Sequence, residues 1–204
     1  MDGRLTENFA EAACWVESLV DRIDPRAWDG PGLGDWSLRA LVGHTSRSLL
    51  TVEAYLVAPA DEVALESPEA YFAFVATQTS TDPGAVFERG VAAGEALGSD
   101  PGRALSAIAD RVIPLVQSAE DRVMTTAAGP MLLSAYLPTR TFELTVHGLD
   151  IAAAAAITAS APDGPLVESL GIAARLAALG GDGERVLLAL TGRTALGDRF
   201  SVLD

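Results

Sequence analysis

The sequence predicts a mainly α-helical protein: an up-and-down four-helix bundle with a short C-terminal helix and a small β-hairpin extension. Apolar residues recur at helical spacing through most of the chain. Three segments begin with a polar residue followed by proline, an order typical of helix starts. The chain has 204 residues, of which 49% are hydrophobic, enough for one sizeable core and a small appendage.

The first two helices are separated by a loop. Helical spacing predicts a first helix over about residues 4–24, and the single cysteine, Cys14, is expected there as a small buried hydrophobe. Residues 24–36 are dense in proline, glycine and aspartate and therefore predict a loop. Ser37 then has the character of an N-cap for a second helix over 38–58.

The middle of the chain is divided by prolines. Residues 61–68 break the helical pattern, and three later helices are predicted to start at Ser67-Pro68, Asp82-Pro83 and Asp100-Pro101. Pro114 lies inside the third of these helices and is expected to kink or shorten it.

The last third predicts two more helices, over 138–157 and 166–179. Residues 185–193 and 198–204 mix aliphatic and β-branched side chains around a short connection, so we expect them to form a terminal hairpin.

Residues 1–160 are expected to form the bundle and residues 161–204 an α/β extension. The net charge of −14 argues against nucleic acid or an anionic membrane as a partner. The longest apolar run, residues 151–157, is too short to cross a bilayer, and the first twenty residues lack the features of a signal peptide. A cytoplasmic protein is expected, and its one cysteine excludes an intramolecular disulfide.

Four ionisable residues form a stripe within the helix predicted over 138–157. Arg140, Glu143, His147 and Asp150 are spaced by three, four and three residues, which places them on one helix face. Glu143 and His147 lie one turn apart and can converge on one ion. The only other histidine, His44, is a candidate third ligand from the second helix. Two imidazoles and one carboxylate suit zinc or another late divalent metal and leave a coordination position open.

Spacing alone also allows a plainer interpretation. Arg140 can pair with Glu143 on a solvated face, and His44 can be a core histidine bonded to a carbonyl or hydroxyl group. The apolar neighbours of the stripe leave this helix little solvated face, however, and a shared metal would satisfy a buried glutamate and histidine together.

Two motifs carry a resemblance to a known family. Residues 34–56, "GDWSLRALVGHTSRSLLTVEAYL", resemble the tryptophan-then-helix segment of the mycothiol-dependent maleylpyruvate isomerase family, within the DinB-like metal-dependent four-helix bundles. The positions that match the two family motifs are Trp36, Ser37, Arg39, Leu41 and His44, and then Arg140, Glu143, His147 and Asp150. The closing "LLALTGR", residues 187–193, is similar to the end of actinobacterial members. The resemblance covers residues 1–158.

The resemblance implies a divalent metal held by His44, Glu143 and His147, most often zinc, with nickel, iron and manganese as alternatives. It also implies mycothiol or a similar thiol as cosubstrate at the open position. Asp150 would orient the assembly, and Arg140 would either neutralise Glu143 or bind a substrate carboxylate. The expected function is a metal- and thiol-dependent transferase or isomerase acting on a small electrophile.

The chain departs from the isomerase after Pro162, where the remaining segment is shorter than that enzyme's C-terminal domain. We therefore expect a general thiol transferase more than an enzyme for maleylpyruvate. The alternatives are a non-catalytic metal-binding bundle, acting as a sensor or partner-binding module, and a member that has lost its metal. The oligomeric state is left open, a homodimer included. Trp36 is expected to staple the helix start to the core.

Overall fold

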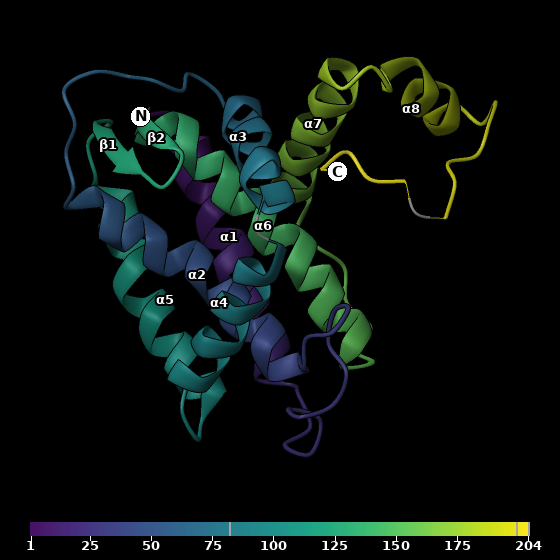
Figure 1. Cartoon of the computed structure of the whole chain (residues 1–204). Helices are drawn as coiled ribbons and strands as arrows, with labels where there is room; N and C mark the ends of the chain where they lie inside the picture. Colours follow the sequence, from purple (N-terminus) through teal and green to yellow (C-terminus); the bar gives the residue numbers. More distant parts are fainter. Residues whose placement is uncertain (82, 199, 204) are drawn as a thin grey trace.

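The structure of the chain is a computed structural model (Figure 1). It describes residues 1–81, 83–198 and 200–203, and for residues 78–81 and 83 it describes the backbone alone. The helices and strands, in chain order, are α1 (Gly3–Val20), α2 (Leu38–Leu56), α3 (Pro68–Thr81), α4 (Pro83–Ala96), α5 (Pro101–Ser118), β1 (Val123–Thr126), β2 (Gly129–Leu132), α6 (Leu133–Ala154), α7 (Asp163–Leu179) and α8 (Gly183–Leu190).

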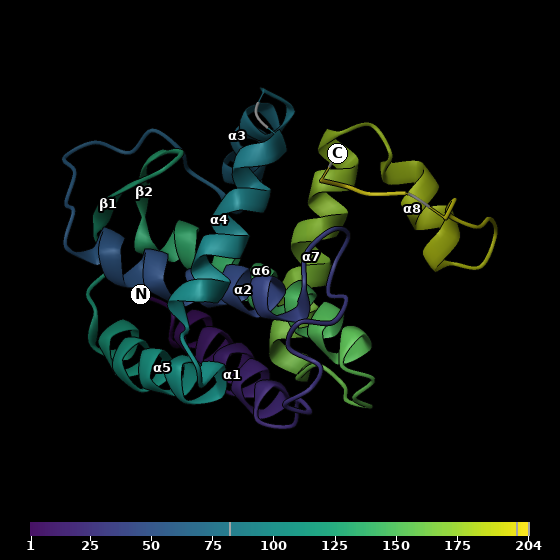
Figure 2. The same cartoon turned by 60° about the horizontal axis from the view of Figure 1, so that its bottom comes forward.

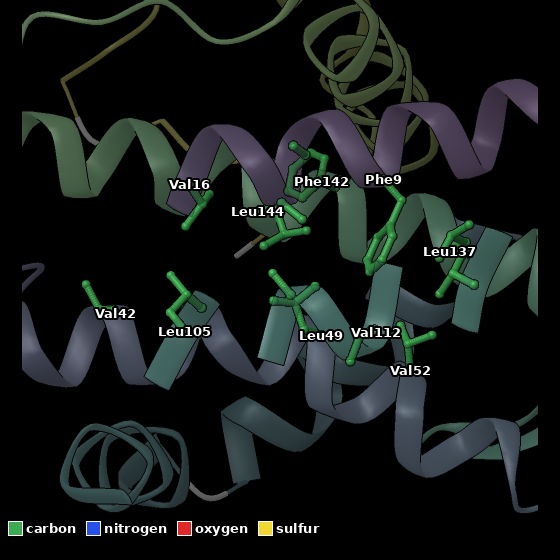
Figure 3. Close-up of a cluster of buried hydrophobic side chains, with 14 of the residues drawn as sticks. Phe9, Val16, Val42, Leu49, Val52, Leu105, Val112, Leu137, Phe142 and Leu144 are labelled. Atoms are coloured by element: carbon green, nitrogen blue, oxygen red, sulfur yellow. The ribbon is translucent and has the colours of Figure 1, made fainter. Parts of the chain in front are cut away.

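Four helices form a ring around the main core. α1 and α2 each pack against both α5 and α6, so α1 lies at the corner opposite α2, and α5 at the corner opposite α6. The apolar side chains of the four helices meet in the centre, where the largest are completely buried (Figure 3). The predicted class, a mainly helical bundle with a small hairpin, is confirmed.

The start of α2 is held by its cap and by the preceding loop. The Ser37 hydroxyl accepts a hydrogen bond from the Ala40 amide at 3.2 Å, as its sequence position predicts. The two preceding amides, of Leu38 and Arg39, donate to the carbonyls of Gly30 and Trp28 at 2.9 Å. These bonds satisfy first-turn amides that have no partner within the helix, and they bind the loop to the end of α2.

α2 and α4 touch backbone to backbone. A side chain at Gly43 would collide with the backbone of Gly94, and a Cβ at Gly94 would lie 2.7 Å from the Arg39 carbonyl oxygen. Both positions therefore need glycine for the helices to approach this closely. Because Gly43 precedes His44, this contact also sets the position of that histidine.

The remaining helices cover the bundle. α3 packs against α6 and α7, and α7 packs against α6 and α1. α8 has no buried residue and projects away from the bundle, on the side opposite α5 (Figure 2). In the part of the chain that the structure describes, no helix is both long and apolar enough to cross a membrane.

The hairpin lies elsewhere than predicted. β1 and β2 pair in antiparallel register between α5 and α6, with Val123 opposite Leu132. The prediction of a hairpin from 185–193 and 198–204 is wrong, because α8 occupies the first segment and the described residues 191–198 and 200–203 form no strand. Residues 199 and 204 lie outside the described chain. The short apolar run at 186–190 fits a helix and a strand equally well, and such runs are not resolved by periodicity.

Three other expectations need correction. α1 ends at Val20, and α6 begins at Leu133, directly after β2, because the amides of Leu133 and Ser134 donate to the Arg122 carbonyl and the Asp121 carboxylate at 2.9 Å. Cys14 is exposed, since the buried face of α1 is formed by other positions: Phe9, Ala12, Ala13, Val16, Leu19 and Val20.

The proline-marked starts at Pro68 and Pro101 are confirmed, and α4 begins at Pro83, although its expected cap, Asp82, lies outside the described residues. α5 continues through Pro114 to Ser118.

Replacing Gly43 by alanine tests the contact between α2 and α4. We expect Gly43→Ala to lower the free energy of unfolding by about 1–3 kcal/mol, because the added methyl group must push α4 away. The urea midpoint of the protein measures the change. Gly171→Ala in α7 is the matched control, with only the flexible Arg175 side chain nearby, and should raise stability by about 0.5–1 kcal/mol. Equal midpoints for Gly43→Ala and wild type would contradict the close contact.

Candidate metal centre

The predicted ligands come from two adjacent helices of the bundle. His44 lies near the middle of α2, and Glu143 and His147 lie one turn apart on α6. Because α2 and α6 pack directly, the three side chains meet, with ligand atoms all within 4.8 Å of one another.

The distances within this cluster suit a divalent cation. Glu143 Oε2 lies 3.2 Å from His147 Nε2 and 3.9 Å from His44 Nε2. Two donors bound to zinc at about 2 Å in a tetrahedral arrangement lie about 3.4 Å apart. Two imidazoles and a carboxylate are also the donor types that bind zinc and its neighbours. The residues present therefore fit a metal, although the cluster itself does not identify the element.

The cluster is neither sealed nor on the surface. The side chains of His44 and Glu143 are 21% and 20% exposed, and that of His147 is 14% exposed. Each of the three ligand side chains thus keeps part of its surface in contact with solvent, as a metal site with an open coordination position requires.

Asp150 supports His147 from behind. Its Oδ2 lies 3.1 Å from His147 Nδ1, on the side of the ring away from Glu143. A carboxylate that accepts the Nδ1 proton orients the ring and leaves Nε2 to face the cluster. This is the contact that the spacing of three residues between them allows.

The three residues of the cluster differ in protonation without a metal. Burial, together with the charge of His147, lowers the pKa of His44 to about 4. Burial works against ionisation of Glu143, but the hydrogen bond from His147 and the charge of Arg140 prevail and hold its pKa at about 2. Burial likewise disfavours charged His147, but its bonds to Asp150 and Glu143 raise its pKa to about 9. At neutral pH the metal-free cluster therefore holds a neutral imidazole, a carboxylate and an imidazolium.

Trp36 covers the ring of His44. The ring centroids lie 4.6 Å apart, and the indole Nε1 donates to the Phe87 carbonyl of α4 at 3.0 Å. Gly90 on α4 lets the indole lie flat, because a Cβ there would be 2.6 Å from the ring. Trp36 packs on the core as expected, and its ring also holds that of His44 in place. The buried Nδ1 of His44 has no hydrogen-bond partner among the described residues.

Arg140 does not form the ion pair with Glu143 that helix spacing allows. Among the described residues, no carboxylate oxygen lies within salt-bridge distance of its guanidinium group. The guanidinium carbon instead lies 5.0 and 4.9 Å from the ring centroids of Tyr71 and Tyr136, and Nε donates to the Thr139 hydroxyl at 3.0 Å.

Sequence reasoning missed the aromatic residues around the site. Tyr71 comes from α3 and has no spacing relation to the stripe, whereas Tyr136 precedes Arg140 by one helix turn but lies before residue 138, where the helix was predicted to begin. The contact of Trp36 with His44 was also missed, although both belong to the first family motif. Of these contacts, only that of Tyr71 depends on another helix packing against α6.

A sequence profile described as the mycothiol maleylpyruvate isomerase N-terminal domain matches residues 9–152 of the chain. This range begins within α1, ends within α6, and contains α2 to α5, the hairpin and all four residues of the stripe. Comparisons with curated proteins and with solved structures found no match.

The raised pKa of His147 predicts that metal binding releases a proton. At pH 7–8.5 binding of one zinc ion should displace about one proton, from His147, because the ligand must be neutral and the other two ligands already are deprotonated. Affinity should then rise about tenfold per pH unit below about pH 9. Calorimetric titrations in two buffers of different ionisation enthalpy count the protons.

The variant Asp150→Asn tests whether His147 is the source of the released proton. Loss of the carboxylate lowers the pKa of His147, so fewer protons should be released at pH 7.5. Asp110→Asn, at an exposed position on α5, is the matched control and should release as many as wild type. Zinc binding without proton release at pH 7 would contradict the protonation state of His147.

Proposed function

Because the chain belongs to the mycothiol maleylpyruvate isomerase N-terminal domain family, we propose that it is a metal- and thiol-dependent enzyme, a transferase or isomerase acting on a small electrophile. The observation that carries the proposal is the meeting of His44, Glu143 and His147 across two helices at distances that suit one divalent cation. Zinc is the metal we expect first, with nickel, iron and manganese as alternatives. Mycothiol, or a similar small thiol, is the proposed cosubstrate.

The residues of the site have distinct tasks in this proposal. His44 and Glu143 are ready to bind a cation at neutral pH, while His147 must first release its proton. Asp150 orients His147, and Trp36 fixes the plane of His44. A bound divalent cation would supply the positive charge that lowers the pKa of a thiol and makes its sulfur nucleophilic at neutral pH.

Two reactions are open to such a thiolate. In an isomerisation its sulfur adds to an activated double bond, the resulting single bond rotates, and the thiolate is expelled again. In a transfer a new S–C bond forms while a leaving group departs with the electron pair of its own bond. Both need the substrate on the open side of the cluster, where the ligand side chains retain partial exposure.

The alternative is a bundle that binds metal without catalysis, as a sensor or partner-binding module. It requires the same cluster and the same fold, so only an activity measurement separates it from the enzyme.

Metal content is the first test. Protein purified without chelator from zinc-replete cells should carry about one divalent metal per chain, and His147→Ala should weaken zinc binding by at least about a hundredfold. Elemental analysis and competition with a chromogenic chelator measure both. Cys14→Ser is the control, because it removes the chain's single thiol, which lies outside the cluster, and it should keep the full stoichiometry. Undiminished affinity in His147→Ala would refute the ligand assignment.

Thiol conjugation is the second test. In a Cys14→Ser background, which prevents alkylation of the protein itself, the metal-loaded protein should accelerate the reaction of mycothiol with a general electrophile. Adding His44→Ala should reduce that rate by at least about a hundredfold, since a ligand to the cation is lost. The loss of free thiol is followed over time. A rate that neither metal removal nor His44→Ala changes, with mycothiol and with other small thiols, would favour the non-catalytic alternative.

A further inference from the structure

Exposed apolar side chains gather in the last fifth of the chain. Among the described residues fifteen large hydrophobic side chains are exposed, and eight of them lie between residues 163 and 203. Six of the eight belong to α7 and α8: Val167, Leu170, Leu179, Leu187, Leu188 and Leu190. Single exposed hydrophobic residues are ordinary in soluble proteins, but a concentration of this kind marks a surface that another molecule covers.

α7 is apolar on two opposite faces. Its inner face is formed by buried residues at helical spacing: Pro165, Ser169, Ile172 and Leu176. Its outer face is formed by exposed residues at the same spacing: Val167, Leu170, Ala174 and Ala178. A surface helix normally carries charged and polar residues on its outer face, and a helix that is hydrophobic all round is a buried one. α7 therefore has the composition of a helix that is covered on both sides.

α8 has little packing of its own. It has eight residues, none of them buried, and Leu187 and Leu190 are 63% and 72% exposed. Helices shorter than about 12 residues are marginal in water unless tertiary packing supports them. α8 meets α7 closely at its first residue, where a Cβ on Gly183 would lie 3.0 Å from the Cα of Ala178. This contact leaves the outer leucines of both helices uncovered, and Figure 2 shows α8 projecting from the bundle.

The distribution of charge favours a second copy of the chain as the cover. Residues 161–204 contain six acidic and four basic residues, a net charge of −2, so residues 1–160 carry −12 of the total of −14. A twofold interface brings identical patches together, and a charged patch would repel its own copy. This repulsion is small at the surface of α7 and α8. A different protein attracted by complementary charge would find little charge there to recognise.

We propose that the outer faces of α7 and α8 form the interface of a homodimer. The two helices make a hairpin joined by residues 180–182, and two such hairpins related by a twofold axis form a four-helix layer with leucines at its centre. The inner face of α7 packs against α6, so the second copy covers the helix that supports Glu143 and His147 from outside. The inference is independent of the proposed function, because it needs neither metal nor thiol.

Sedimentation velocity of the full chain tests the dimer directly. The wild-type protein should sediment as a monomer at about 1 µM and as a dimer at about 100 µM, or as a dimer throughout, which corresponds to a dissociation constant of about 10 µM or tighter. A wild-type protein that remains monomeric at the higher concentration overturns the inference.

Three variants locate the interface. Leu170→Glu on α7 and Leu187→Glu on α8 each place two like charges within the contact, and each should raise the dissociation constant at least about a hundredfold. Leu115→Glu is the matched control, at an exposed leucine of α5 on the opposite side of the molecule, and should dimerise like wild type (Figure 2). Far-UV circular dichroism checks the fold of each variant, and Leu187→Glu cannot disturb the core because α8 has no buried residue. A folded Leu187→Glu protein that dimerises like wild type, or loss of the dimer in Leu115→Glu, overturns the assignment of this surface.

Amide hydrogen exchange locates the contact without a substitution. Peptides that cover residues 183–190 should exchange at least about tenfold more slowly at the higher concentration, whereas peptides of α5 should not change. A dimer that gives α8 no protection contradicts the proposed interface. A different protein that copurifies with a monomeric chain, one molecule per chain, and is released by Leu187→Glu would be the true occupant of the surface and would equally overturn the homodimer.

Discussion

An ionised carboxylate held inside an apolar bundle is the constraint around which the rest of the site is arranged. Glu143 lies between helices whose facing side chains are largely aliphatic and aromatic, and it keeps its charge there because His147 and Arg140 lie close by. Without a metal, the proton on His147 supplies the nearest positive charge, at 3.2 Å. A divalent cation would take the place of that proton and use the same oxygen and nitrogen atoms. The negative charge of Glu143 is thus balanced by a nearby positive charge both without and with a bound metal.

Close contacts between helices hold the residues of the site in position. Gly43 lets α4 lie directly on α2, and the indole of Trp36 fills the space between α4 and His44. His44 is therefore positioned by packing, while His147 is positioned by its bond to Asp150. The two imidazoles are held in different ways, and their pKa values lie on opposite sides of neutrality in the metal-free protein as a result.

Aromatic side chains also determine the position of a charged group, the guanidinium group of Arg140. Tyr71 and Tyr136 take up one side of the Arg140 guanidinium group and leave its Nη groups without protein acceptors. A charge that served only to stabilise the fold would be expected to find a carboxylate or several carbonyl groups instead. The charge of Arg140 and the partly exposed side chain of Glu143 thus lie on adjacent turns of α6.

The sequence by itself determined the helical class, most helix starts, and the three residues that meet in the cluster. Spacing along a helix decides which side chains share a face, so the stripe from Arg140 to Asp150 was visible in the chain. Only the tertiary structure decided how helix faces meet: the diagonal placement of α1 and α2, the place of the hairpin, and the contact of Arg140 with Tyr71. Helix spacing offered Arg140 a carboxylate three residues away, but Tyr71 on another helix competes for the same charge. The reason is that local periodicity depends on neighbours within a turn, whereas a buried side chain takes its partners from whichever element packs against it.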